Sequence, residues 1–136
     1  MRAAFLKNPL LNGTDTSAGK TVQIQIKDGS FAEISMEASS ADIVVIAQAW
    51  HWAHPDYHDA VAEFARVLKP DGTLAFIWNL EDSRTEWVAK VRDAYEVYEQ
   101  GTPQYRLGWW KETFQTAAYK VRIGCYLGCL CLVTAC

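Results

Sequence analysis

The residues best suited to chemistry lie in one short stretch, Ala47 to His58, which reads AQAWHWAHPDYH. It holds two tryptophans, three histidines and a glutamine directly after an apolar run. A histidine can accept or donate a proton near neutral pH, and an aromatic face can stabilise a nearby cation. This stretch is therefore the first candidate for a ligand site.

The three histidines, His51, His54 and His58, are spaced three and four residues apart. On one continuous helix they would share a face and could ligate a metal ion. Pro55 interrupts that helix, because the residue before a proline is pushed out of helical geometry. We therefore expect no metal site. His51 remains a candidate general base, and a purely structural role for it stays open.

Two strands are predicted before this stretch. Val22, Ile24 and Ile26 alternate with polar residues, which predicts a half-exposed strand that ends at Asp28-Gly29. The run Ile43–Ala47 is β-branched and apolar on both faces, which is typical of a strand in the middle of a parallel sheet.

The next elements alternate between helix and strand. Helical spacing predicts a helix over Pro55–Lys69, ended by Pro70-Asp71-Gly72, then a strand over Thr73–Trp78 and a helix from Arg84 to about Gln100. Five residues should form the buried stripe of the last helix: Trp87, Val88, Val91, Tyr95 and Tyr98. The alternation predicts an α/β fold with a mostly parallel sheet.

Open α/β sheets bind ligands beyond the carboxyl ends of their strands. Three predicted strand ends should meet at one edge, namely Asp28–Phe31, Ala47–Trp52 and Trp78-Asn79. For any one tryptophan, a place in the core remains the alternative to ligand contact. The sequence contains no G-x-G-x-x-G, no P-loop and no G-x-S-x-G pattern, so a dinucleotide, a nucleoside triphosphate or a serine nucleophile has no support.

The composition limits the kinds of partner that this chain is expected to bind. The 136 residues carry a net charge of −3 and a pI near 5.5, which argues against a nucleic-acid surface. The longest apolar tract is shorter than the roughly 18–20 residues of a membrane span, and no secretory signal is evident, so we expect a cytoplasmic protein without a membrane partner. The four cysteines all follow Ile123 without paired C-x-x-C spacing, which favours reduced thiols.

Two segments, ADIVVIAQAWHW and EFARVLKPDGTLAFIWN, resemble the class I S-adenosylmethionine-dependent methyltransferases of the type 11 branch. They are similar to small-molecule enzymes of the trans-aconitate methyltransferase kind, as is EQGTPQYRLGWWKETF. The resemblance covers roughly Gly29 to Lys120. It implies a partial Rossmann-like fold and methyl transfer from S-adenosylmethionine to a small-molecule acceptor such as a carboxylate.

The resemblance also implies site residues. It places the cofactor against Gly29, Ser30, Phe31, Ala47 and Gln48. It places the acceptor nearer four others: Trp50, His51, Trp52 and Asn79. Aligning an acceptor with the cofactor can carry most of the rate, so a general base is optional, with His51 as the candidate.

The sequence departs from the family pattern at both ends. The glycine-rich cofactor loop and the acidic ribose-binding residue of the family have no counterpart here, which implies an N-terminally truncated domain over 1–120 that lacks the first strands of the sheet. A divergent apolar tail follows at 121–136. We expect an exposed sheet edge that favours self-association. The alternative is a non-catalytic fragment with no cofactor binding of its own.

Overall fold

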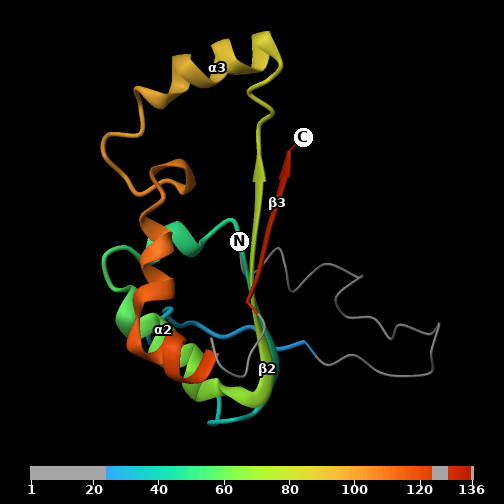
Figure 1. Cartoon of the computed structure of the whole chain (residues 1–136), viewed down its shortest axis with the longest axis vertical. Coiled ribbons are helices and arrows are strands. Elements are labelled where there is room, and N and C mark those ends of the chain that lie inside the picture. The colour runs from blue at the N-terminus through green and yellow to red at the C-terminus, as the bar shows by residue number, and fades with distance from the viewer. Residues whose placement is uncertain (1–23, 124–128, 136) are drawn as a thin grey trace, which may run out of the picture.

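The computed structural model describes residues 24–123 and 129–135, with side chains up to residue 121. Strands and α-helices alternate up to residue 96, short 3-10 or π helices (η) follow, and a last strand ends the described chain (Figure 1). In chain order the elements are β1 (Ala41–Ala47), η1 (Trp50–Ala53), α2 (Tyr57–Val67), β2 (Leu68–Leu80), α3 (Glu86–Glu96), η2 (Tyr105–Leu107), η3 (Trp109–Gln115), η4 (Tyr119–Ile123) and β3 (Cys129–Ala135).

The three strands form one parallel sheet in the order β1-β2-β3. The helix α2 connects β1 to β2, which pair along most of β1. The predicted α/β fold with a parallel sheet is therefore confirmed. Residues Cys129–Ala135 of the predicted tail pair with β2, while the division of the chain at residue 120 stays a prediction.

The strand β2 begins at Leu68, before the predicted start at Thr73. Its pairing with β1 jumps from Ala41↔Leu68 to Ile43↔Thr73, so Pro70-Asp71-Gly72 forms an irregularity within the strand pairing. A Cβ on Gly72 would lie 3.1 Å from the carbonyl oxygen of Ala41, so this glycine permits the close approach of the two strands.

Only one face of β1 is covered by the described elements. Ile46 is buried on the side of α2, whereas Ile43 and Val45 are 55% and 51% exposed. Figure 1 shows α2 and the 105–123 segment on the same side of the sheet. The prediction that β1 is buried on both faces is wrong for this structure, because no described element packs over Ile43 and Val45.

The core is centred on Trp50, whose side chain is fully buried. Its ring lies 5.1–5.6 Å from the rings of Phe31, Tyr57, Phe64 and Phe76. These four rings come from the segment before β1, from α2 and from β2. One side chain therefore joins three parts of the chain, a geometry in which aromatic pairs stabilise beyond the area they bury.

The segment before β1 is tied to α2 by side-chain bonds. The Glu63 carboxylate accepts the backbone N–H of Ile34 at 2.8 Å, and Arg66 donates to the carbonyl oxygens of Ile34 and Met36. Residues 24–29 form no regular strand, so the predicted strand is wrong there, while Val22 lies outside the described residues. No described strand pairs with this segment.

The helix α3 is shorter than predicted and none of its residues is buried. Trp87 and Tyr98 are 69% and 77% exposed. The predicted buried stripe is therefore wrong. Figure 1 shows the reason, because α3 lies beyond the end of β2, away from the layer formed by α2 and the sheet.

The bond from Glu63 to the segment before β1 should make stability depend on acid. Arg66 and the N–H of Ile34 lower the pKa of Glu63 from 4.5 to about 2. A lowered folded-state pKa stabilises the fold above about pH 4.5, and this contribution is lost as the pH falls toward 2. Glu63→Gln should lower the free energy of unfolding at neutral pH by about 1 kcal/mol, a modest value because solvent screens Arg66.

Urea unfolding of both proteins at pH 7 and at about pH 2.5 measures this effect. The difference between wild type and Glu63→Gln should shrink in acid. A difference that is equal at both pH values would contradict the assignment. Glu33→Gln, on the segment itself and without a bond to Arg66 among those described, is the matched control.

Candidate active site

A cavity of about 310 Å³ opens beyond the carboxyl ends of β1 and β2. Gln48 and His51 enter it from the connection after β1, and Trp78 and Asn79 from the end of β2. This is the edge at which parallel sheets bind ligands. The structure thus brings together four residues from two of the three predicted strand ends.

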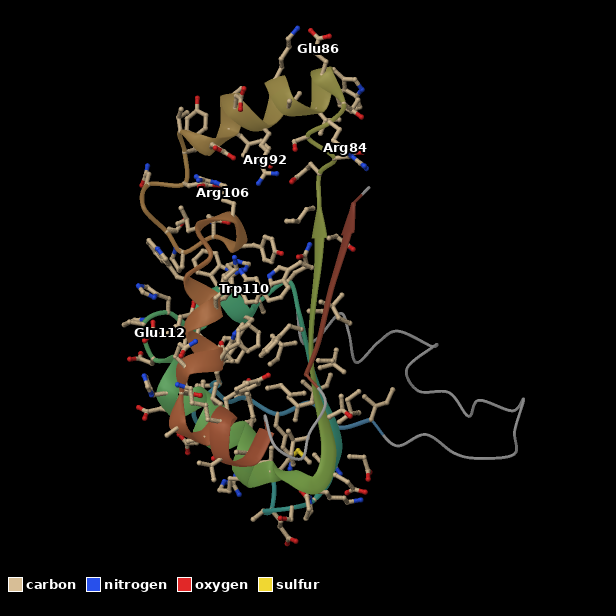
Figure 2. The ribbon with its side chains drawn as sticks, viewed as in Figure 1. Arg84, Glu86, Arg92, Arg106, Trp110 and Glu112 are labelled. Atoms are coloured by element: carbon tan, nitrogen blue, oxygen red, sulfur yellow. The ribbon has the colours of Figure 1, made fainter. Side chains whose placement is uncertain are left out.

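The opposite wall of the cavity comes from α3 and the segment that follows it. Arg92 and Tyr95 belong to α3, and Tyr105 and Arg106 to η2. In Figure 2, Arg92 points from α3 toward the segment that carries Arg106, whereas Glu86 points away. The wall therefore combines cations with aromatic rings.

Gln48 fixes the ends of the two strands to each other. Its backbone N–H donates to the carbonyl oxygen of Ile77 at 2.8 Å, and its side-chain amide donates to that of Asn79 at 2.9 Å. Its φ of 56° lies in the left-handed region, which costs a non-glycine residue free energy. The two hydrogen bonds offset that cost and turn the chain away from the sheet at the cavity.

His51 lines the cavity but is largely buried, and its ring accepts a hydrogen bond. The indole N–H of Trp78 donates to Nδ1 at 3.2 Å, and burial lowers the pKa of His51 below 6.5. The ring is therefore neutral at pH 7, and since Nδ1 accepts, the hydrogen-bond pattern assigns the proton to Nε2. This tautomer is a hydrogen-bond donor. The predicted role as a general base stays a prediction that the tautomer does not favour.

A network of five charged side chains stands beside the cavity. Arg92 donates from Nε to Glu96 at 2.9 Å, and its Nη1 lies 3.9 Å from Glu81. Arg106 lies 3.2 Å from Glu96 and donates to Glu99. A backbone hydrogen bond, then one from the Tyr95 hydroxyl, and then the charge of Arg92 lower the pKa of Glu81. Glu81 is therefore ionised at neutral pH.

Sequence reasoning missed this network. The spacing of Arg92 and Glu96 by one helical turn was a signal for that pair. Arg106 lies beyond the helix, and no local pattern links it to Glu96 and Glu99.

The residues predicted at the adenine do not reach this cavity. Gly29 and Ser30 line a second cavity of about 700 Å³ formed by residues between 25 and 40. The Phe31 ring packs against Trp50 and Phe64 in the core. The reason is that the described residues before Gly29, residues 24–28, form no strand, so this turn does not follow a described strand of the sheet. The binding roles of these residues stay predictions.

Three further residues were predicted to contact the cofactor or the acceptor, and they lie partly on the surface and partly in the core. Ala47 is exposed at the end of β1. Trp52 is half exposed, with its ring 5.3 Å from that of His51, but outside the set that lines the cavity. Trp50 is fully buried in the core. For this tryptophan the structure therefore agrees with the alternative to ligand contact, which was a place in the core.

The histidines are separated as predicted. His54 lies in the turn before Pro55, and His58 lies in α2, where its Nε2 is 3.7 Å from Glu112. Among the described residues, no group of three or more histidine, cysteine, aspartate or glutamate side chains could hold a metal ion.

Comparison with known protein families now identifies the chain. Residues 7–76, about half of it, match the model of a methyltransferase domain. The chain belongs to this family. The match includes β1, α2 and most of β2, so the family covers the strand-end connection that carries Gln48 and His51.

Curated relatives of this chain that are named as methyltransferases come from both a bacterium and a yeast. An uncharacterized methyltransferase of Mycobacterium tuberculosis is 44% identical over 63 residues, which cover 46% of this chain and 25% of the relative. An uncharacterized methyltransferase-like protein of Schizosaccharomyces pombe is 33% identical over 100 residues, 74% of this chain and 38% of the relative. The chain thus spans a quarter to two fifths of these relatives. No solved structure matches.

The comparisons leave some predictions untested. The similarity to enzymes of the trans-aconitate methyltransferase kind and the truncation of the methyltransferase domain both stay predictions. Within the described residues, no helix is long and apolar enough to cross a membrane. The cellular location of the methyltransferase stays a prediction.

The tautomer of His51 can be tested directly. Trp78→Phe keeps an aromatic ring but removes the N–H that donates to Nδ1. We expect the wild-type His51 ring to carry its proton on Nε2, and the variant to mix both tautomers and to titrate at a higher pH. Imidazole ¹⁵N shifts measured against pH report both. A wild-type ring protonated on Nδ1 would contradict the assignment.

Proposed function

We propose that this methyltransferase chain transfers a methyl group from S-adenosylmethionine to a small-molecule acceptor at the strand-end cavity. The observation that carries the proposal is the meeting of Gln48, His51 and Asn79 beyond the carboxyl ends of two paired parallel strands in a methyltransferase domain. Ligands of open α/β sheets bind at this edge.

The residues at this edge fit part of such a cofactor. Gln48 and Asn79, which both line the cavity, carry amide groups that suit an amino acid moiety. When bound, S-adenosylmethionine supplies an electrophilic methyl group on a sulfonium. The role of this chain would be to hold and orient the reactants, which can contribute most of the rate acceleration.

The proposed acceptor is a carboxylate, and Arg92 supports this choice. Its Nε bonds Glu96, while its Nη1 stands 3.9 Å from Glu81, beyond hydrogen-bond distance. The outer edge of a guanidinium can bind a carboxylate through two parallel hydrogen bonds. The N–H of His51 would be a second donor on the opposite wall. An acceptor held in this way stays ionised and needs no general base.

The alternative is a non-catalytic fragment without cofactor binding of its own. The separation of Gly29 and Ser30 from the strand-end cavity favours it, because these residues were expected at the adenine. Titration calorimetry with S-adenosylhomocysteine separates the two. Binding in the micromolar range would support the transferase. Absence of binding at millimolar concentration, by a chain whose circular dichroism shows it folded, would support the fragment.

Arg92→Met tests the acceptor. Losing a charge-assisted hydrogen bond of about 1.5–3 kcal/mol should raise KM for a carboxylate acceptor about tenfold or more. The affinity for S-adenosylhomocysteine should not change. Arg84→Met is the matched control, since Arg84 is 82% exposed, bonds Asp82 and does not line the cavity. An unchanged KM in Arg92→Met would contradict the assignment of the carboxylate to Arg92.

A further inference from the structure

The charged side chains beside the strand-end cavity form one row in which acids and bases alternate. In order they are Glu81, Arg92, Glu96, Arg106 and Glu99. Both arginines approach the same oxygen, Oε1 of Glu96, with Nε at 2.9 Å for Arg92 and at 3.2 Å for Arg106. Three glutamates against two arginines give the row a formal charge of −1. The surplus charge of this row is therefore negative.

The surplus charge lies at Glu81. The ion pair described for its carboxylate, with Nη1 of Arg92, has an N–O distance of 3.9 Å, whereas Glu96 and Glu99 each accept a hydrogen bond from an arginine. Glu81 lines the cavity, its side chain is 50% exposed, and it is ionised at neutral pH. The hydroxyl of Tyr95 donates to it and so holds the carboxylate in place.

This negative charge affects the carboxylate that the proposed function places on Arg92. A carboxylate at the outer edge of the guanidinium also comes close to Glu81, because Nη1 of Arg92 and the Glu81 carboxylate are only 3.9 Å apart. Two like charges at such a distance repel each other even where solvent screens them. A ligand with a carboxylate alone loses at Glu81 part of the affinity that it gains at Arg92. A cationic group beside the carboxylate turns that repulsion into attraction.

We propose that the acceptor is an α-amino acid, whose carboxylate binds Arg92 and whose ammonium group binds Glu81. This inference rests on the proposed function and narrows its acceptor from carboxylates to zwitterions. In an α-amino acid both charged groups are attached to one carbon, which suits the adjacent charges of Arg92 and Glu81. His51 and Asn79, two of the residues expected near the acceptor, line the same cavity.

The methyl transfer then needs no further reactant. A carboxylate oxygen forms the new bond to the methyl carbon, while the bond from that carbon to sulfur breaks and leaves its electron pair on sulfur. The products are the methyl ester of the amino acid and S-adenosylhomocysteine. No proton moves, so the ammonium group stays charged and bound to Glu81.

Matched pairs of ligands test the proposal, each an amino acid and the same molecule without its amino group. The pairs are L-phenylalanine with hydrocinnamate, L-norleucine with hexanoate, and L-alanine with propionate. Each ligand is titrated into the full chain saturated with S-adenosylhomocysteine, and binding is followed by NMR. At least one amino acid should bind about tenfold more tightly than its partner, because its ammonium group replaces a repulsion by an attraction.

Glu81→Gln tests the residue. The variant removes the charge but keeps an oxygen that can accept from Tyr95. It should bind the amino acid about tenfold more weakly, and the partner without an amino group as tightly as wild type or more tightly. A structural defect would instead weaken both ligands alike. Glu86→Gln is the matched control, since Glu86 also lies on the charged surface of α3 but is 83% exposed and points away from the cavity (Figure 2). It should change neither affinity.

The same titrations contain the results that would overturn the inference. Equal affinities within every pair, no binding of any probe at tens of millimolar, or an equal loss for both ligands in Glu81→Gln would each do so, while binding of S-adenosylhomocysteine would leave the proposed function standing. A folded wild-type chain that binds no S-adenosylhomocysteine would overturn both.

The methionine end of the cofactor is the other source of an α-amino acid group. Titration with 5′-methylthioadenosine, which lacks that end, separates it from the acceptor. We expect Glu81→Gln to bind S-adenosylhomocysteine and 5′-methylthioadenosine as wild type does. If the variant loses affinity for S-adenosylhomocysteine alone, Glu81 binds the cofactor, and its assignment to the acceptor is overturned.

Discussion

The burial of one indole ring, that of Trp50, holds the described structure together. Its ring packs against four aromatic rings, and its N–H donates to Thr113 at 2.8 Å. A buried indole N–H without a partner would cost about 1–3 kcal/mol. Thr113 meets that need and in turn donates to the carbonyl oxygen of Trp110 at 2.6 Å. The core thus fixes η3 against the connection that follows β1.

This constraint also positions the cavity. Because Trp50 is anchored, the next residue, His51, is held where the indole of Trp78 reaches its Nδ1. Trp78 packs in turn against Tyr105 and Trp110, with ring centroids 4.8 and 5.0 Å away. A rigid aromatic layer therefore lies below the polar groups of the site. Such support is what a ligand site needs, since small displacements of its groups weaken binding and catalysis.

The sequence predicted the positions of β1 and α2 better than it predicted which of their residues are buried. The β-branched run of β1 and the helical spacing of α2 are local properties, and the structure confirms both, with Gln48 and Asn79 at the strand ends. Periodicity shows which residues are apolar but not what covers them. Ile43 and Val45 are as apolar as the sequence suggested, yet half exposed, because coverage depends on contacts distant in sequence. The bond from Arg106 to Glu96 is non-local for the same reason.

Magnitudes show why the stripe of α3 is exposed. Burying a large apolar side chain is worth about 1.5–3 kcal/mol, whereas an exposed ion pair contributes about 0–1 kcal/mol. If a described surface could receive Trp87 and Val91, their burial would outweigh the exposed bond between Lys90 and Glu86. Ion pairs therefore do not hold the stripe away from the core. It is exposed because the described residues provide no surface that could receive it.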